Sequence, residues 1–311
     1  MTNPTVQVWL DGQLVATDAA KLSHLTHTFH YGLGAFEGIR SYAQAGGGSA
    51  VFRLREHIER LFASCHLVTI DKESIGLTVD QVMDACVETL RANDLAEGYI
   101  RPVIYLGAGT MGIGATTNPV HTMVAAWHWG AYLGDEGLER GIDACVSSFR
   151  RADHSSTLSK GKLTGQYINS ILAKREALKN GFAEAIMLNS SGFVTEASGE
   201  NLFMVSGGRL ITPPLGMNIL AGITRATVIE LAREQGIEVE ERAFARDELY
   251  LADEVFMTGT AAEVTPVRSI DRRTIGAGSR GEMTAVLQQR YFDVVKGNER
   301  DHGHWRTNYT V

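Results

Sequence analysis

Residues 158–167 read LSKGKLTGQY, a polar stretch that leads into a helical apolar pattern. Lys160 and Lys162 stand two positions apart, and Tyr167 follows the second lysine by five residues. A lysine is a useful nucleophile only where burial or a neighbouring cation lowers its pKa, and otherwise it is a solvated charge. The stretch alone therefore fits a solvated loop as well as a catalytic lysine, and partners elsewhere in the chain must decide.

The composition is that of a globular protein with a large core. The sequence has 311 residues, of which 44% are hydrophobic and 21% charged, and this length fits two packed domains. The net charge of −7 argues against a nucleic-acid partner. No apolar run reaches transmembrane length, and the N-terminus lacks a signal-peptide pattern. With three cysteines and no CxxC spacing, we expect a cytoplasmic protein without disulfides or membrane partners.

Apolar periodicity predicts interleaved strands and helices. The expected helices cover 55–68, 79–93, 166–179, 223–235 and 281–296. After a hairpin in 6–15, the expected strands cover 99–106, 120–128, 142–149, 184–189, 193–197, 200–205, 238–243, 254–258 and 263–268. Because tight turns join many of these strands, we expect an α/β fold with mixed sheets of the α+β kind.

A stretch rich in glycine and charge, 129–140, predicts the connection between two domains. We expect an N-terminal α/β domain over 1–128 and a C-terminal α/β domain over 141–311. The tail from about 297 to 311 is polar, and we expect it to be only partly ordered.

Two motifs could indicate a dinucleotide-binding site or a metal site. Residues 107–112 read GAGTMG, which matches a dinucleotide fingerprint, but that fingerprint needs a helix directly after the glycines. Here IGATTNPV and another expected strand follow, so we expect a flexible loop. His24, His27 and His30 could bind a metal, yet they lie in a segment without a convincing helix or a suitably spaced carboxylate. We therefore expect no metal site.

Two turns could bind an anion. Ile223 and Thr224 follow Gly222 where a helix is expected to begin, so free N–H groups and a hydroxyl converge. Thr260 and Ala261 lie in a tight turn between two expected strands. An ordinary helix cap and an ordinary turn would explain each stretch taken alone.

Charged residues elsewhere could complete such a site. Arg60 could supply the counter-charge to an anion, or it could simply lie on a solvated helix face. Glu196 and Glu200 lie among apolar neighbours, where a carboxylate needs a cationic or proton-donating partner. A surface pair at a strand end is the alternative for these two.

Segments along most of the chain resemble those of branched-chain amino-acid aminotransferases, which are fold-type IV pyridoxal-phosphate enzymes. The resemblance extends to about residue 296, and it implies a two-domain fold-type IV architecture with the cofactor between the domains. In family order, the segments are HTFHYGLGAFEGIR (27–40), VFRLREHIERL (51–61), YIRP (99–102), GKLTGQY (161–167), EASGENLF (196–203), ITPP (211–214), AGITR (221–225) and YLADEVFMTGTAAEVTPVRSID (250–271).

The resemblance implies roles for the cofactor residues. Lys162, rather than Lys160, would hold pyridoxal 5'-phosphate as an internal aldimine and act as general acid and base. Tyr167 would hydrogen-bond the phenolic oxygen of the cofactor, and Glu196 would pair with its pyridine nitrogen, which makes the ring an electron sink. The remaining cofactor contacts, mostly to the phosphate, would come from Arg60, Leu220, Ile223, Thr224 and Thr260.

The resemblance also implies a substrate pocket that accepts apolar and acidic side chains. The pocket would be completed by a second subunit, so at least a homodimer is expected. The α-carboxylate would meet Tyr99, Thr260 and Ala261. The walls would be Phe36, Gly38, Trp129, Tyr132 and Tyr167, with Tyr31, Met111 and Ile113 from the second subunit. Arg101, Tyr31 and Tyr132 would hold the distal carboxylate of the acidic substrate.

The expected activity is transamination between branched-chain L-amino acids (leucine, isoleucine, valine) and 2-oxoglutarate, giving branched 2-oxo acids and L-glutamate. Another fold-type IV activity stays open, such as a D-amino-acid or (R)-amine transaminase or an aminodeoxychorismate lyase. A nicotinamide-binding oxidoreductase, which would rest on the GAGTMG loop, is the alternative from a different class.

Overall fold

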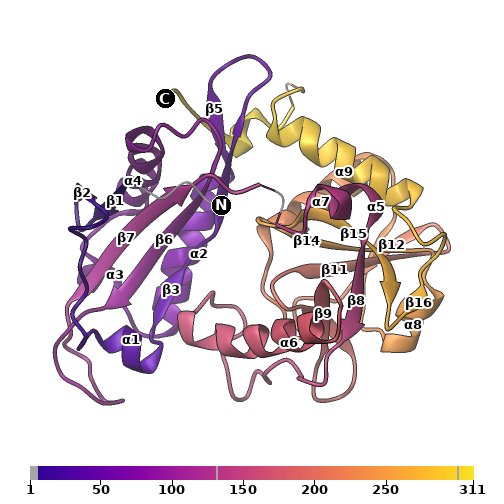
Figure 1. Cartoon of the computed structure of the whole chain (residues 1–311), viewed down its shortest axis with the longest axis horizontal. Coiled ribbons are helices and arrows are strands. Elements are labelled where there is room, and N and C mark those ends of the chain that lie inside the picture. The colour runs from indigo at the N-terminus through magenta and orange to yellow at the C-terminus, as the bar shows by residue number, and fades with distance from the viewer. Residues whose placement is uncertain (1–5, 131, 300) are drawn as a thin grey trace. The chain divides into compact units, whose positions relative to one another are not determined.

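A computed structural model of the chain describes residues 6–130, 132–299 and 301–311 (Figure 1). The chain forms two compact units. The described residues of Met1–Trp129, Gly161–Gln166 and Val294–Val311 form the first unit, and those of Gly130–Lys160 and Tyr167–Asp293 form the second. The division expected from the sequence placed everything after 140 in one domain. The compact units differ from that division in two stretches, Gly161–Gln166 and Val294–Val311, which belong to the first unit. The division into folding domains stays a prediction.

The first unit is built on an antiparallel sheet. Its strands lie in the order β17-β5-β4-β6-β7-β1-β2, and β3 pairs with β6. Their bounds are Gln7–Leu10 (β1), Gln13–Ala16 (β2), Gly34–Phe36 (β3), Ile39–Ala43 (β4), Ser49–Phe52 (β5), Gly98–Leu106 (β6), Val120–Trp127 (β7) and Arg306–Tyr309 (β17). The register of β6 against β7 places Tyr99 directly opposite Trp127, so the two rings lie on one face of the sheet.

The described helices of the first unit are α1 (His27–Tyr31), α2 (Leu54–Leu67), α3 (Lys72–Ile75) and α4 (Val79–Ala92). Helix α2 buries Ile58, Leu61 and Phe62, which are the residues that its apolar spacing placed on one face. Helix α1 contradicts the expectation that the histidine segment has no helix. It has five residues, which is too short for an apolar period to show in the sequence.

The second unit is built on a mixed sheet, as expected. Its strands lie in the order β10-β9-β8-β15-β14-β11-β12-β13, and β16 pairs with β15. Strand β8 runs parallel to β9 and β15, and β12 runs parallel to β13, whereas the other pairs are antiparallel. The bounds are Ile142–Val146 (β8), Glu184–Leu188 (β9), Val194–Ala197 (β10), Asn201–Ser206 (β11), Arg209–Thr212 (β12), Val239–Glu241 (β13), Glu254–Gly259 (β14), Glu263–Ile270 (β15) and Arg273–Thr274 (β16).

The later part of the chain contains α5 (Asp135–Arg140), α6 (Tyr167–Lys179), α7 (Ile223–Glu234), α8 (Arg246–Leu251) and α9 (Glu282–Val295). The long helices α6, α7 and α9 match the predicted ranges closely, and Gly181 follows α6 with a left-handed φ of 79°. Helices α5 and α8 have six residues each, and the apolar pattern did not predict them. None of the helices that the structure describes has the length and apolar character of a membrane span.

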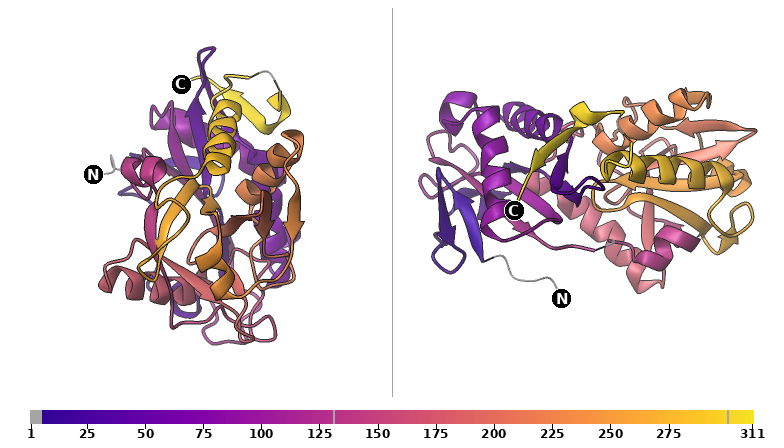
Figure 2. Two further views of the ribbon diagram at one scale, coloured as in Figure 1. Left: turned by 90° about the vertical axis from the view of Figure 1, so that its right-hand side faces the viewer. Right: turned by 90° about the horizontal axis from the view of Figure 1, so that it is seen from above.

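The described part of the C-terminal tail is ordered, so the expectation of partial order is wrong there. Strand β17 pairs with β5, and both figures show the yellow segment beside it (Figure 1 and Figure 2). Tyr309 is buried, and its hydroxyl donates to the carbonyl of Leu95 at 2.7 Å. Trp305 is also buried, with the Arg53 guanidinium 4.4 Å from its ring. Two aromatic anchors in an otherwise polar sequence hold the tail.

If the tail belongs to the core of the first unit, Tyr309→Ala will lower the free energy of unfolding by about 3–4 kcal/mol, because it removes a buried ring and its hydrogen bond. The matched control is Asn308→Ala, one residue earlier on the exposed side of β17, which should change stability by less than about 0.5 kcal/mol. Urea denaturation of both variants measures the difference. Equal stability of the two variants would contradict the assignment.

Candidate functional site

The segment that carries Lys162 is bound to the first unit by its backbone. The Lys162 amide donates to Ser64 Oγ of α2 at 3.0 Å, and its carbonyl accepts from the Phe36 amide of β3 at 3.1 Å. Leu163 forms an isolated bridge with Ala35. The Lys162 ammonium lies 5.0 Å from the centre of the Phe36 ring. These contacts give the half-buried side chain a fixed origin beside an aromatic wall.

Two glycines permit this close approach. The Gly165 amide donates to the Gly32 carbonyl at 2.9 Å, and the Thr164 hydroxyl donates to the same carbonyl at 2.5 Å. A Cβ at Gly32 would lie 2.8 Å from the Gly165 backbone, and Gly32 has a φ of +73°. A side chain at Gly32 would therefore both strain the backbone and push the lysine segment away.

The second lysine of the stretch has its own partners. Lys160 Nζ, in the second unit, donates to the carbonyl of Leu215 and to that of Ile219 at 2.9 Å. Partial burial lowers the pKa of Lys160, which the charge of Glu196 partly opposes. The sequence treated Lys160 as a neighbouring charge and could not reveal these carbonyls, because they lie more than fifty positions away.

Arg60 does not lie on a solvated helix face but pairs with a buried carboxylate. Its Nε and Nη2 donate to the two oxygens of Glu37 at 2.6 and 2.9 Å, and His57 Nδ1 lies 2.8 Å from the same carboxylate. Burial opposes the charged form of Glu37, but Arg60 and His57 outweigh burial and hold its pKa far below the usual range. The pair fixes the orientation of the guanidinium. The sequence analysis missed Glu37, although it stands within the quoted segment GAFEGIR.

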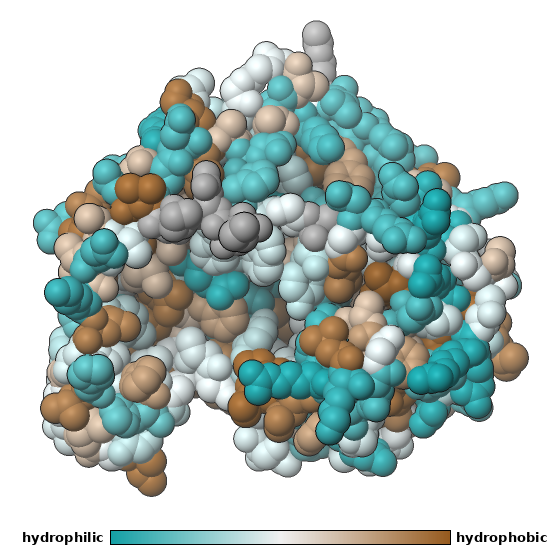
Figure 3. Space-filling view, viewed as in Figure 1, coloured by the Kyte–Doolittle hydropathy of each residue, from teal (hydrophilic) through white to brown (hydrophobic). Residues whose placement is uncertain are grey.

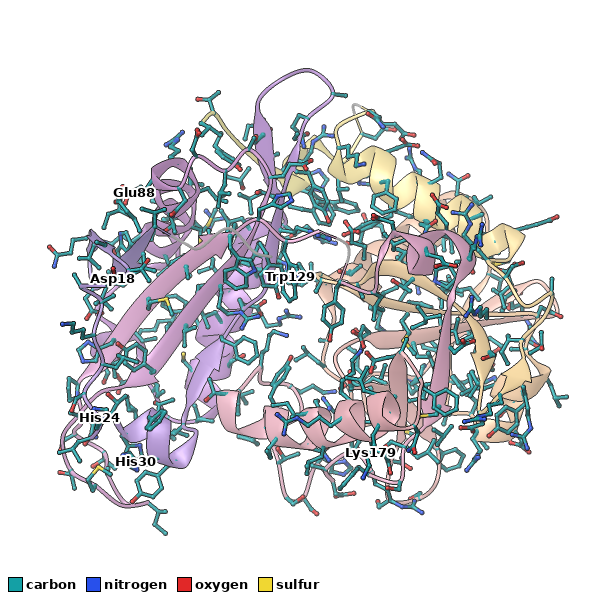
Figure 4. All side chains as sticks on the ribbon, viewed as in Figure 1. Asp18, His24, His30, Glu88, Trp129 and Lys179 are labelled. Carbon is teal, nitrogen blue, oxygen red and sulfur yellow. The ribbon has the colours of Figure 1, made fainter. Side chains whose placement is uncertain are left out.

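Arg101 lies among aromatic rings. Its guanidinium carbon is 4.8 Å from the Phe36 ring centre, 5.4 Å from that of Tyr99 and 5.8 Å from that of Trp127. Its Nε is buried and makes no hydrogen bond to the residues that the structure describes. Trp129 packs edge-to-face on Tyr99 with ring centres 4.7 Å apart (Figure 4). The three aromatic rings therefore hold the Arg101 guanidinium in a place where it can bind a ligand.

Gly38 completes this group. A Cβ at Gly38 would stand 1.8 Å from the Tyr99 hydroxyl, so a larger residue would displace the phenol. The predicted wall residues Phe36, Gly38 and Trp129 are thus brought together within the first unit with Arg101 and with Tyr99, the residue expected to meet the α-carboxylate. Trp127 also belongs to this group of residues, although the sequence did not predict it. Its place in the group follows from the register of β6 against β7, which sets it opposite Tyr99 and which the sequence alone does not give.

The other predicted pocket residues of the first unit lie on its surface. Tyr31 is 44% exposed, Met111 is 40% exposed and Ile113 is 96% exposed. Loop 107–119 follows β6 without forming a helix, so it lacks the element that a dinucleotide fingerprint requires. The histidine rings nearby bind backbone carbonyls: His27 Nε2 lies 2.9 Å from Gly112 O. His30 Nε2 lies 2.6 Å from His24 O (Figure 4).

In the second unit, Glu196 is a buried carboxylate with three donors. Arg151 Nη2 lies 2.5 Å from Glu196 Oε1, and Asn201 Nδ2 and the Leu220 amide each donate to Oε2 at 3.0 Å. The expected cationic partner is therefore Arg151. The sequence analysis missed it, because it lies 45 positions away in a loop before the lysine segment.

The same asparagine connects Glu196 to the expected anion site at α7. Asn201 Nδ2 also donates to the Leu220 carbonyl at 3.0 Å, and a Cβ at Gly222 would meet Asn201 Oδ1 at 1.8 Å. Ile223 begins α7, and in the described structure no side chain caps this helix start. Its first N–H groups point out of the helix and can bind an anion, while Thr224 is buried in the first turn.

The second expected turn follows β14. Thr260 and Ala261 are partly buried and connect β14 to β15. Thr258, at the end of β14, has a buried hydroxyl that makes no hydrogen bond to the described residues. Tyr167 begins α6 and is half-buried, and Tyr132 is 37% exposed with the Lys174 ammonium 5.1 Å from its ring centre.

The sequence and the structure of the chain are both similar to those of one family of known proteins. The amino-transferase class IV profile matches residues 34–270. A branched-chain-amino-acid aminotransferase of Pseudomonas aeruginosa is 46% identical over 300 residues, which are 96% of each chain. The crystal structure of the Escherichia coli branched-chain amino acid aminotransferase superposes with a TM-score of 0.95 at 42% identity, covering 98% of this chain and 99% of that one.

A further similar structure was solved with a ligand bound. It is a T.th. branched-chain amino acid aminotransferase complexed with N-(5'-phosphopyridoxyl)-L-glutamate. It superposes with a TM-score of 0.90 at 39% identity, and the match covers 98% of this chain and 99% of that chain.

The buried Glu37 carboxylate should be essential to the first unit. Glu37→Gln leaves the largely buried Arg60 guanidinium without its counter-charge and should lower the free energy of unfolding at pH 7 by about 3–5 kcal/mol. The pKa of Glu37 is lowered in the folded protein, so the wild type is more stable than the variant above pH ~4.3. This difference in the free energy of unfolding shrinks as the pH falls further. Urea denaturation at several pH values checks both points. As a control, Glu59→Gln on the exposed face of α2 should change little.

Proposed function

The chain belongs to the amino-transferase class IV family, within its branched-chain aminotransferases, and we propose that it exchanges an amino group between branched-chain L-amino acids and 2-oxoglutarate. The observation that carries the proposal is Arg101 among Phe36, Tyr99 and Trp127. The aromatic walls suit an apolar branched side chain, and a half-buried guanidinium suits a carboxylate. One pocket can therefore accept both substrates of the exchange.

The cofactor of this enzyme is pyridoxal 5'-phosphate. When bound, it supplies a carbon that forms a covalent link to an amine and a protonated ring that withdraws electrons from the substrate Cα. The chain's donor set fits such a group. Glu196 offers a buried carboxylate for a ring nitrogen, the start of α7 offers uncapped N–H groups for a phosphate, and Thr258 adds a buried hydroxyl next to the second turn.

We assign the cofactor contacts as follows. Lys162 Nζ would carry the covalent link, Glu196 would pair with the ring nitrogen, and Tyr167 would donate to the phenolic oxygen. The phosphate contacts belong to Arg60, Ile223, Thr224 and Thr260, with Leu220 placed by its amide bond to Glu196. Support comes from the fixed guanidinium of Arg60 and the fixed backbone of Lys162.

After the substrate amine has displaced it from the covalent link, Lys162 Nζ would be free to accept the proton from the substrate Cα and to donate it to C4′ of the cofactor. The backbone bonds of Lys162 to Ser64 and Phe36 hold the side chain's origin while its long stem moves. Arg151 and Asn201 keep Glu196 oriented, so its charge stabilises a protonated ring nitrogen. Tyr99 and the turn at Thr260 and Ala261 bind the α-carboxylate.

We further infer a homodimer in which Tyr31, Met111 and Ile113 reach the pocket of the second copy. Ile113 is 96% exposed and Phe29 of α1 is 77% exposed, which leaves apolar side chains unprotected. Figure 3 shows apolar residues on the part of the first unit where α1 and loop 107–119 lie. Large exposed apolar side chains that recur on one short helix and one loop favour an interface. The three cysteines are buried and unpaired, which supports a reducing compartment such as the cytoplasm.

The assignment of the cofactor lysine is tested by two single variants. The purified protein should absorb near ~410–420 nm, and borohydride should remove this band and fix the cofactor to the chain. Lys162→Ala should lose the band that borohydride removes, while Lys160→Ala should keep it. Mass spectrometry of borohydride-treated peptides locates the link. A link at Lys160 would contradict the assignment.

The substrate class is tested by a panel of amino donors with 2-oxoglutarate. L-Leucine, L-isoleucine and L-valine should all react, because an apolar pocket discriminates one methylene group by only about 1–3 kcal/mol. D-Alanine and (R)-1-phenylethylamine should react far more slowly. Glutamate formation measures the rate. Activity with only the last two donors would replace the proposal by another fold-type IV activity.

A further inference from the structure

Helix α6 carries a lysine that is partly buried and that none of the roles above uses. Lys174 Nζ donates to Glu184 Oε2 at 2.5 Å and to the Ala183 carbonyl at 2.7 Å. Its side chain is 18% exposed, whereas Lys179 at the end of the same helix is exposed to solvent (Figure 4). A lysine held in this way needs a carboxylate partner, and Glu184 supplies it.

The same ammonium contacts Tyr132. Lys174 Nζ lies 5.1 Å from the centre of the Tyr132 ring, and the two side chains share a hydrogen bond. An ammonium has only donors, so the Tyr132 oxygen accepts this bond and the phenol directs its own proton to a third group. Tyr132 is 37% exposed, so a ligand can reach the phenol.

Two buried carboxylates set the charge around this pair. Glu184 is fully buried and accepts from Ser198 Oγ at 2.5 Å. Glu200 is 5% exposed and accepts from the Gly199 amide at 3.1 Å. Burial first, and then the charge of Glu184, raises the pKa of Glu200 to about 8, with Lys174 opposing and Glu196 adding to the effect. At neutral pH, Glu200 therefore carries a proton, while Lys174 stays bound to Glu184.

We propose that Lys174 is a positioning residue that orients the Tyr132 phenol as a donor to the distal carboxylate of the acidic substrate. The inference rests on the proposed function and on the role that the family resemblance implies for Tyr132, which is to help receive that carboxylate. A cation behind the phenol strengthens its O–H as a donor to an anion, whereas an apolar side chain requires only the surface of the ring. Lys174 thus favours 2-oxoglutarate and glutamate and leaves branched-chain substrates unaffected.

The test compares two substrates that differ in the distal group. Lys174→Met in the cofactor-loaded enzyme should raise the KM for glutamate about tenfold, and the KM for L-leucine should stay within about twofold. Calorimetry with two unreactive acids should show the same split, with glutarate binding about tenfold more weakly and 4-methylpentanoate unchanged. Lys174→Arg should restore glutarate binding because it keeps the cation. Lys179→Met is the matched control and should change neither KM.

A second variant separates substrate selection from folding. Lys174→Met leaves Glu184 buried without its partner, so Lys174→Met/Glu184→Gln removes both charges and relieves that penalty. The double variant should still show the split between glutarate and 4-methylpentanoate. Equal weakening of both acids, or no change in either, would overturn the inference while leaving the proposed function standing. Failure of the wild-type enzyme to bind either acid would overturn both.

The pH dependence gives an independent readout. As Glu200 ionises around pH ~8, the surroundings of Tyr132 gain one negative charge, because the raised pKa of Lys174 keeps it charged and the raised pKa of Tyr132 keeps it neutral. Glutarate affinity should then fall between pH 7 and 9 more steeply than 4-methylpentanoate affinity. Glu200→Gln should remove the difference between the two slopes. Parallel slopes in the wild-type enzyme would contradict the role of this charge cluster.

Discussion

The backbone attachment of residues 161–166 to the first unit is the constraint on which the site depends. A lysine that must reach a reacting carbon needs a long, mobile side chain, and such a side chain is useful only if its origin is fixed. The Lys162 amide and carbonyl are both engaged, by Ser64 and Phe36, so the origin cannot drift. The attachment requires Gly32 to pass within contact distance of Gly165, and this requirement explains two glycines that carry no chemistry themselves.

Compensation of buried charge organises the rest of the functional residues. Glu37 faces Arg60 and His57, Glu196 faces Arg151, and Glu184 faces Lys174. Each carboxylate holds a cation, or is held by one, in a single orientation, because breaking such a pair leaves an uncompensated buried charge. These pairs therefore do more to orient the proposed cofactor and substrate contacts than to stabilise the fold. Glu200 keeps a proton near neutral pH because it is buried and lies close to the charge of Glu184, although Lys174 opposes both effects.

Long elements and family segments were readable in the sequence, whereas short elements and long-range partners were not. Helices α2, α4, α6, α7 and α9 follow from apolar period, and Gly181 marks the end of α6 because a left-handed residue suits glycine. Helix α1 and strand β17 are too short for any period to show. The tail was expected to be only partly ordered because most of its residues are polar. The burial of its two aromatic residues, Trp305 and Tyr309, orders it.

The sequence by itself determined the mixed α/β fold and the family, and it supplied the proposal of Lys162 as the cofactor lysine, since these rest on local spacing and on segments read in order. Only the tertiary structure decided which residues neutralise the buried carboxylates and which carbonyl groups bind Lys160. Arg151 stands 45 residues from Glu196, and the carbonyls that bind Lys160 lie 55 and 59 residues away. Such pairs form because a buried charge must find an opposite charge or dipole in space, and distance along the chain does not enter that requirement.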